Sequence, residues 1–380
     1  MKGLLVVSAE TATFLWPAGE EAGSAIRQLT LPLKVAVHRN PADGIAFAPL
    51  GSLSSDSEAE IVVVERLGAH LPIWEDVDLL SILLRGFFST AANELPASAR
   101  NVSYYLYFPP WMAPRERRLL RNAARDSGLT VLDGLERGLA LALAQAQRRA
   151  APAAGGWVIA DRCGSDLDLY AIAKERTSGR EELSLTLYRQ CSELFSSYYV
   201  ARDQAMEHAV SESLASLPGD WPLLAADGEA ANLLNAVAGT RSPVEEVSFS
   251  EYLAENLRSE EESAIRFTRK WRYWLDHGDA RLDPLTTGKE SFPCRLERLF
   301  EIPERPPQQL YVGLRAGFAE TRRETHEICR VILSRPHDFH FAPGHLLVRA
   351  SLATAERGEL AVEVLQRAKQ VHVEKVEFPS

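Results

Sequence analysis

The chain has 380 residues and a formal net charge of −10, because 52 aspartates and glutamates outnumber 42 lysines and arginines. This acidic balance argues against a nucleic-acid or anionic-membrane binder, whose binding face is normally basic. Hydrophobic residues at 46% and charged residues at 25% match an ordinary globular protein and exclude disorder as the main state. At this length we expect two or three domains.

The cysteines and the apolar runs indicate the compartment. The four cysteines lie far apart and form no Cys-x-x-Cys pair, so neither a zinc ribbon nor a disulfide framework is predicted. The apolar run after Lys2 is too short for a signal peptide, and no stretch reaches the ~18 apolar residues of a membrane-spanning helix. We therefore expect a cytoplasmic protein with no membrane insertion and no nucleic-acid partner.

The first 150 residues alternate between strand-like and helix-like patterns. Leu4–Val7 and Thr11–Trp16 are rich in strand-forming types. Between Val77 and Ala92, leucines and phenylalanines recur at helical spacing. A further helix is predicted to begin at Pro114 and to end at Gly128, which suits a C-cap. Strands and helices in alternation are typical of an α/β domain.

A run of small residues around Pro152 predicts a linker and the first domain boundary, at 150/151. After it, two apolar segments, 157–161 and 167–172, predict strands joined by a tight turn. We expect a helix over 266–275, where Trp271 and Trp274 are three residues apart, and a second boundary at 279/280. The last hundred residues alternate apolar and polar side chains in several short segments, which predicts an all-β sandwich.

This order of elements resembles the DnaK-type heat-shock chaperone family of the actin-like ATPase superfamily. Residues 108–142 are similar to the family's strand, its arginine-bearing helix and its "N-E-P-T-A-A-A-L-A" string, and residues 341–364 are similar to the hairpin "D-x-x-G-I-L-x-V-x-A" of its peptide-binding domain. The resemblance spans nearly the whole chain. It implies an α/β actin-like ATPase fold with lobe I at 1–150 and a shortened lobe II at 151–279, followed by a β-sandwich at 280–380. We expect the second helical subdomain to be reduced or absent, and we expect no helical lid.

The resemblance also locates the phosphate loops, in which glycines let backbone N–H groups approach the phosphates and an acid holds the metal through water. In the first loop the family's acid is replaced by Ser8 and a glycine by Glu10. The family's catalytic lysine falls on Glu65. Two carboxylates would thus face anionic phosphates, which opposes ATP binding.

The second phosphate loop is partly retained. Asp161, Gly164 and Asp168 keep the family's residues, whereas Cys163 and Ser165 replace two glycines, and each added Cβ restricts a close backbone approach.

Two further motifs depart from the family. Glu136 survives from the "N-E-P-T" string, but the proline, which in the family helps to signal between domains, is Arg137. The adenosine-binding "G-G-S-T-R-I-P" falls on residues 226–232, where only one glycine remains.

These departures predict a DnaK-like pseudo-ATPase that acts as a protein- or peptide-binding adaptor or scaffold. We expect no catalytic residue, no metal and no cofactor; Asp161, Gly164, Asp168 and Glu136 would be vestiges of a nucleotide site. The partner would be a protein or an extended peptide, which a sandwich groove could bind by strand-like hydrogen bonding. Two alternatives stay open: a chaperone-type ATPase that binds ATP and magnesium through altered contacts, and a structural subunit of a larger assembly.

Overall fold

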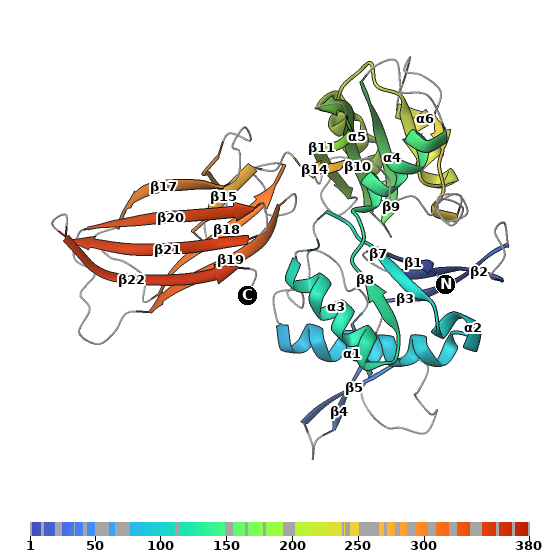
Figure 1. The fold of residues 1–380 in the computed structure, drawn as a ribbon, viewed down its shortest axis with the longest axis horizontal. Helices are drawn as coiled ribbons and strands as arrows, with labels where there is room; N and C mark the ends of the chain where they lie inside the picture. Colours follow the sequence, from blue (N-terminus) through green and yellow to red (C-terminus); the bar gives the residue numbers. More distant parts are fainter. Residues whose placement is uncertain are drawn as a thin grey trace. The chain divides into compact units, whose positions relative to one another are not determined.

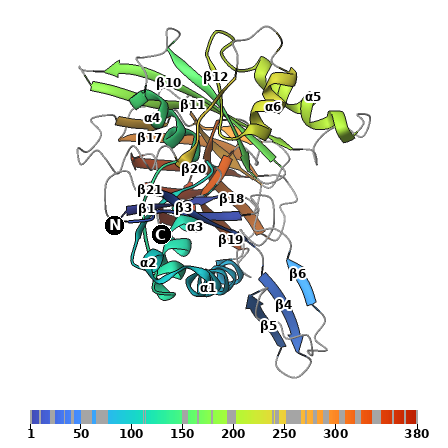
Figure 2. The ribbon, with the colours of Figure 1, turned by 90° about the vertical axis from the view of Figure 1, so that its right-hand side faces the viewer.

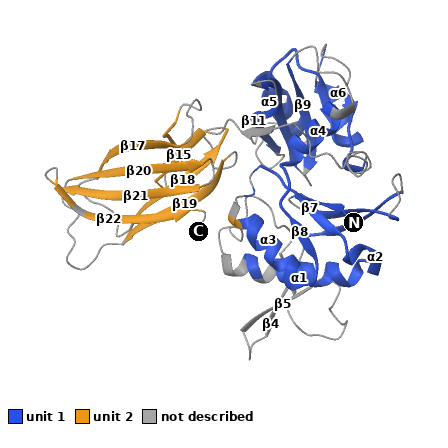
Figure 3. Cartoon of the chain, in the orientation of Figure 1, with its two compact units in different colours: residues 1–112, 116–269 blue, residues 113–115, 270–380 orange. Residues whose placement is uncertain are grey.

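The computed structural model divides into two compact units, residues 1–112 with 116–269 and residues 113–115 with 270–380 (Figure 1, Figure 3). The division lies between 269 and 270, ahead of the predicted boundary at 279. The structure describes residues 2–8, 11–19, 25–33, 35–40, 44–49, 61–64, 77–110, 112, 114–148, 155–163, 166–177, 180–192, 202–237, 239, 244–250, 266–269, 272–277, 282–286, 293–302, 309–318, 325–334, 344–354, 357–366 and 369–378.

The first sheet of unit 1 has the strand order β3-β2-β1-β7-β8. Its first three strands form an antiparallel meander, and β7 and β8 add in parallel on the other side of β1. Phe14 and Tyr104 pack edge to face, with ring centroids 5.2 Å apart, so aromatic burial joins the meander to the parallel strands. The strands are β1 (Lys2–Val7), β2 (Thr11–Pro17), β3 (Ile26–Pro32), β7 (Ser103–Tyr107) and β8 (Thr130–Leu132).

Four helices follow or connect these strands in the chain: α1 (Val77–Glu94), α2 (Ala97–Arg100), α3 (Pro114–Asp126) and α4 (Arg137–Arg148), the last of which packs on the second sheet described below. The predicted helix over 77–92 and the predicted helix start at Pro114 are confirmed. Gly128 follows α3 with a φ of 80°, a conformation that a glycine adopts without strain, so the predicted stop is confirmed as well. A small separate sheet has the order β5-β4-β6, formed by β4 (Val35–Asn40), β5 (Gly44–Pro49) and β6 (Ile61–Val64).

The second sheet of unit 1 has the order β13-β12-β9-β10-β11-β14 and repeats the connectivity of the first. Strands β9, β10 and β11 form an antiparallel meander, and β12 and β13 add in parallel on the other side of β9. The strands are β9 (Gly156–Cys163), β10 (Asp166–Thr177), β11 (Arg180–Ser192), β12 (Leu223–Ala225), β13 (Glu245–Glu246) and β14 (Arg266–Arg269).

Helices cover both faces of this second sheet (Figure 2). Because side chains alternate along a strand, Leu167 and Leu169 point to one face, where they join an apolar cluster with α5 (Arg202–Ala215) and α6 (Gly228–Val237). Asp168 and Tyr170 point to the other face. There α4 lies so close that a Cβ added at Gly138 would come within 2.4 Å of the Tyr170 ring.

Unit 2 contains two four-stranded sheets, β16-β15-β18-β19 and β17-β20-β21-β22, in which all neighbouring strands are antiparallel. The predicted alternation is confirmed, since Val348, Ala350 and Leu352 are buried between half-buried or exposed residues. The strands are β15 (Arg272–Asp276), β16 (Asp283–Pro284), β17 (Cys294–Glu301), β18 (Gln309–Gly317), β19 (Thr325–Ser334), β20 (His345–Thr354), β21 (Arg357–Gln366) and β22 (Lys369–Phe378).

The predicted helix over 266–275 is wrong. The segment forms β14, which pairs with β11, and β15, which pairs with β18. Tyr273, Trp274 and Leu275 are consecutive and all buried, a pattern that suits a strand covered on both faces better than an amphipathic helix. Among the described residues, no helix is both long enough and apolar enough to cross a membrane.

Candidate functional site

The turn between β1 and β2 lies where the resemblance places the first phosphate loop. Ser8 is 4% exposed and closes this turn itself: its backbone N–H donates to the Thr11 carbonyl at 2.8 Å, and its Oγ accepts the Thr11 N–H at 2.9 Å. A side chain that accepts its neighbour's N–H in this way stabilises a turn locally. Ser8 was expected only as the replacement of the family's acid, but in the structure its side chain also stabilises the turn.

Arg137, the first residue of α4, connects the two sheets of unit 1. Its Nε and Nη2 donate to the two carboxylate oxygens of Asp161, at 2.5 and 2.6 Å, in a bidentate ion pair. Its Nη1 donates to the carbonyl of Val7 at the end of β1, at 3.0 Å. Arg137 is 6% exposed and Asp161 is 1% exposed, so this is a buried charge pair with both carboxylate oxygens engaged.

Asp168 lies beside this pair, directly opposite Asp161 in the antiparallel register of β9 and β10. It is fully buried, and its two carboxylate oxygens accept hydrogen bonds from the hydroxyls of Tyr188, at 2.8 Å, and Tyr170, at 3.4 Å. Burial raises the pKa of Asp168, and the Tyr188 hydrogen bond and Arg137 offset only part of that rise, so that the pKa is about 7. Burial also raises the pKa of Asp161, and Arg137 opposes that rise by stabilising its ionised form.

A polar cavity of about 330 Å³ opens next to the ion pair. Hydroxyl-bearing residues line it, among them Thr11 and Thr13 on β2 of the first sheet and Ser248, which follows β13 of the second sheet. The Phe249 ring lies 5.5 Å from the Arg137 guanidinium carbon, within the range of a cation–π contact. The cavity thus presents hydroxyls, an aromatic ring and a guanidinium that is already paired.

The stretch predicted to match the adenosine motif begins α6. Asp227 Oδ1 accepts the backbone N–H of Ala230 at 2.8 Å, which makes Asp227 the N-cap of that helix. Its carboxylate lines the cavity beside Asp161 and contributes to the raised pKa of Asp161.

The structure brings together four of the predicted residues: Ser8, Arg137, Asp161 and Asp168. Glu136 immediately precedes α4, is 1% exposed and forms a backbone bridge with Phe108. Cys163 ends β9, but its side chain lies outside the described residues, as do Gly164, Ser165, Glu10 and Glu65 entirely. In the described part of the chain, no group of three or more histidine, cysteine, aspartate or glutamate side chains could hold a metal ion.

The partners of both aspartates were not predicted from the sequence. Arg137 was expected only as the replacement of a proline, and no role was expected for Tyr170 or Tyr188. A signal for the first tyrosine was present, because Tyr170 is two residues from Asp168 and therefore lies on the same face of a strand. No protein-family model matches the chain, and no curated protein is similar enough to match it.

Proposed function

We propose that unit 1 has an actin-like ATPase fold and that unit 2 is a β-sandwich like the peptide-binding domain of DnaK-type chaperones. The shared connectivity of the two sheets of unit 1 supports the first part, because two similar lobes of one topology characterise the fold that the sequence resembles. The two antiparallel sheets of unit 2 support the second part.

We further propose that the protein is a pseudo-ATPase that works as a protein- or peptide-binding adaptor in the cytoplasm. The ion pair between Arg137 and Asp161 carries this proposal. In the family that the chain resembles, the acid at this strand end holds a magnesium ion through water. Here a guanidinium from the same chain takes both oxygens of Asp161, so the residues present do not fit a magnesium–nucleotide complex at this carboxylate.

The same contact gives the adaptor role a physical basis. Arg137 binds Asp161 of the second sheet and the Val7 carbonyl of the first, so the chain itself supplies a link between its two lobes. A link of this kind needs no ligand, and it leaves the lobes connected whether or not nucleotide is present. An adaptor of constant shape benefits from such a contact, because a preorganised binding surface loses less free energy on association.

Unit 2 offers edges at which an extended peptide could pair. Strands β17 and β22 terminate one of its sheets, and terminal strands carry backbone N–H and C=O groups along one side. A peptide strand can add to such an edge by main-chain hydrogen bonds.

A thermal-shift titration with ATP and magnesium tests the pseudo-ATPase proposal. A ligand present at 100 times its dissociation constant would add about 2.7 kcal/mol of stability, which is readily detected. We expect no upward shift for the natural chain. A clear shift, together with ATP turnover that Asp161→Ala abolishes, would refute the proposal.

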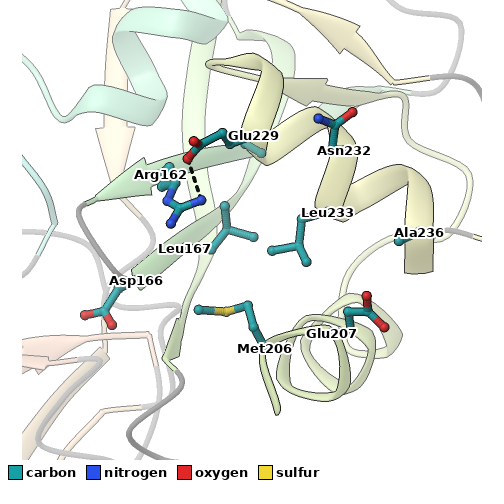
Figure 4. Close-up of a pocket in the computed structure, with 10 residues that line it drawn as sticks. Arg162, Asp166, Leu167, Met206, Glu207, Glu229, Asn232, Leu233 and Ala236 are labelled. Atoms are coloured by element: carbon teal, nitrogen blue, oxygen red, sulfur yellow. Dashed lines mark ion pairs between the residues drawn. The ribbon is translucent and has the colours of Figure 1, made fainter. Parts of the chain in front are cut away.

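One observation favours the alternative of an ATPase with altered contacts. The polar cavity next to the ion pair also includes Arg162, whose side chain is 45% exposed and pairs with Glu229 (Figure 4). A guanidinium has more N–H donors than one carboxylate uses, so Arg162 could also meet a phosphate. The thermal-shift titration separates the pseudo-ATPase from this alternative. If ATP raises the melting temperature and Arg162→Ala removes that rise, the Arg162 guanidinium holds the phosphates and the alternative is supported.

A further inference from the structure

Asp168 lies beneath α4, the helix that also holds the link between the two sheets of unit 1. The helix packs against β9, β10 and β11. A Cβ added at its second residue, Gly138, would come within 2.4 Å of the Tyr170 ring, and the Tyr170 hydroxyl donates to Asp168 at 3.4 Å. Its first residue, Arg137, donates to the Val7 carbonyl of the first sheet. Asp168 is therefore connected to the linking helix through a single side chain.

The charges around Asp168 do not balance once its carboxyl ionises. While Asp168 is neutral, the buried Arg137 and the buried Asp161 neutralise each other. An ionised Asp168 adds a buried negative charge, and the described groups that face it include no cation besides Arg137. Those titratable or charged groups are Asp161 on β9, Asp166 and Tyr170 on β10, Tyr188 on β11 and Arg137 on α4.

Proton binding to Asp168 depends on whether α4 covers it. Under the helix the pKa of the carboxyl is about 7, mainly because burial disfavours its charged form. Where α4 has lifted away, water reaches the carboxyl and its pKa returns toward the ordinary value of 3.8. Opening therefore releases a proton between these two values, and each pH unit makes opening about tenfold more favourable. Above pH 7 both forms are ionised, so the increase stops.

We propose that the Asp168 carboxyl is a proton-controlled release for α4, which holds the helix in place while it is neutral and lets it open more often as the pH rises. Opening lifts Arg137 from Asp161 and from the Val7 carbonyl, so the two sheets of unit 1 lose this link. The release goes beyond the proposed adaptor function and does not require it, because it uses only contacts within unit 1. A link that needs no ligand would in this way respond to pH.

Hydrogen exchange of the α4 peptide, Arg137–Arg148, tests the proposal on the full chain. The exchange is measured by mass spectrometry from about pH 5 to about pH 8, in EDTA so that no divalent cation contributes. After correction for the intrinsic exchange rate, opening of α4 should rise about tenfold per pH unit up to about pH 7 and then level off. In Asp168→Asn the opening should not depend on pH, because the amide has no proton to lose in this range. A pH-independent opening in the natural chain, or the same rise in Asp168→Asn, would overturn the proposal.

The same experiment distinguishes release of α4 from opening of the whole second sheet. We expect the α4 peptide to be less protected than peptides of β9 and β10 at every pH, because the helix can lift while the strands stay paired. Equal protection would mean that the sheet opens as one unit, and would overturn the proposal.

Tyr188→Phe keeps the proposal testable if Asp168→Asn does not fold. The Tyr188 hydroxyl stabilises the ionised carboxyl through its 2.8 Å hydrogen bond, so without it opening should continue to rise above pH 7. An unchanged levelling point would overturn the proposal. The matched control is Glu181→Gln, which removes an exposed carboxyl on β11 of the same sheet and should leave the pH profile of α4 unchanged. Loss of the pH dependence in this control would count equally against the proposal.

Discussion

Replacing Asp168 by asparagine should stabilise the protein at alkaline pH. The carboxyl is fully buried and has a pKa of about 7, against an ordinary value of 3.8. Between these two values the folded state binds more protons than the unfolded state, so stability falls as pH rises and the loss is complete above pH 7. The difference corresponds to about 4 kcal/mol. An asparagine side chain cannot ionise, so the variant should avoid this loss while its amide oxygen still accepts the Tyr188 hydroxyl.

The measurement should report on unit 1 alone, because a chain with two units need not unfold in one step. Hydrogen exchange followed by mass spectrometry, on peptides that cover β9 and β10, reads the opening free energy of the sheet that holds Asp168. We expect the variant and the natural chain to differ little near pH 4. The difference should grow toward about 4 kcal/mol at pH 8.

An exposed aspartate provides the control. Asp133 is 63% exposed and pairs with Arg121, so Asp133→Asn should change the opening free energy by no more than about 1 kcal/mol at any pH. If Asp168→Asn were destabilising at pH 8, or had the same effect at pH 5 and pH 8, the buried carboxyl would not titrate as the structure implies.

Two further predictions concern α4. Arg137→Met should destabilise unit 1 by about 3 to 5 kcal/mol, because it leaves the buried Asp161 carboxylate without its counter-charge. Adding Asp161→Leu removes the unpaired carboxylate and should recover most of the lost free energy of unfolding, measured in urea. A double variant no more stable than Arg137→Met would contradict the argument. Gly138→Ala should cost about 1 to 3 kcal/mol, because the new methyl would lie within 2.4 Å of the Tyr170 ring. In the Tyr170→Leu background, which lacks the ring, Gly138→Ala should cost less stability. An unchanged unfolding midpoint for Gly138→Ala in the natural chain would show that α4 does not pack on the Tyr170 ring.

Local patterns were enough to predict several elements. Apolar spacing located α1, a proline located the start of α3, and Gly128 located its end, because each of these signals acts through nearby backbone geometry or one buried face. Strand alternation likewise located the buried faces of β18 and β20 in unit 2. The helix predicted over 266–275 failed because two tryptophans three residues apart fit a helix face, whereas pairing with β11 and β18 made the segment extended.

The candidate site was only partly visible in the sequence. Asp161 and Asp168 could be placed on neighbouring strands, because a short hairpin brings its two arms into register. The contact between Arg137 and Asp161 spans 24 residues and depends on how α4 crosses the second sheet. The packing of α5 and α6 against Leu167 of β10 likewise joins segments that are far apart in the sequence.

By itself the sequence determined the acidic balance, the order of strands and helices in most of the chain, and the positions of the two hairpin aspartates. Tertiary structure alone decided which cation neutralises Asp161 and which tyrosine hydroxyls donate to the buried Asp168. The reason is physical: hydrophobic periodicity is a property of neighbouring residues, whereas burial and charge pairing arise only when distant segments pack together.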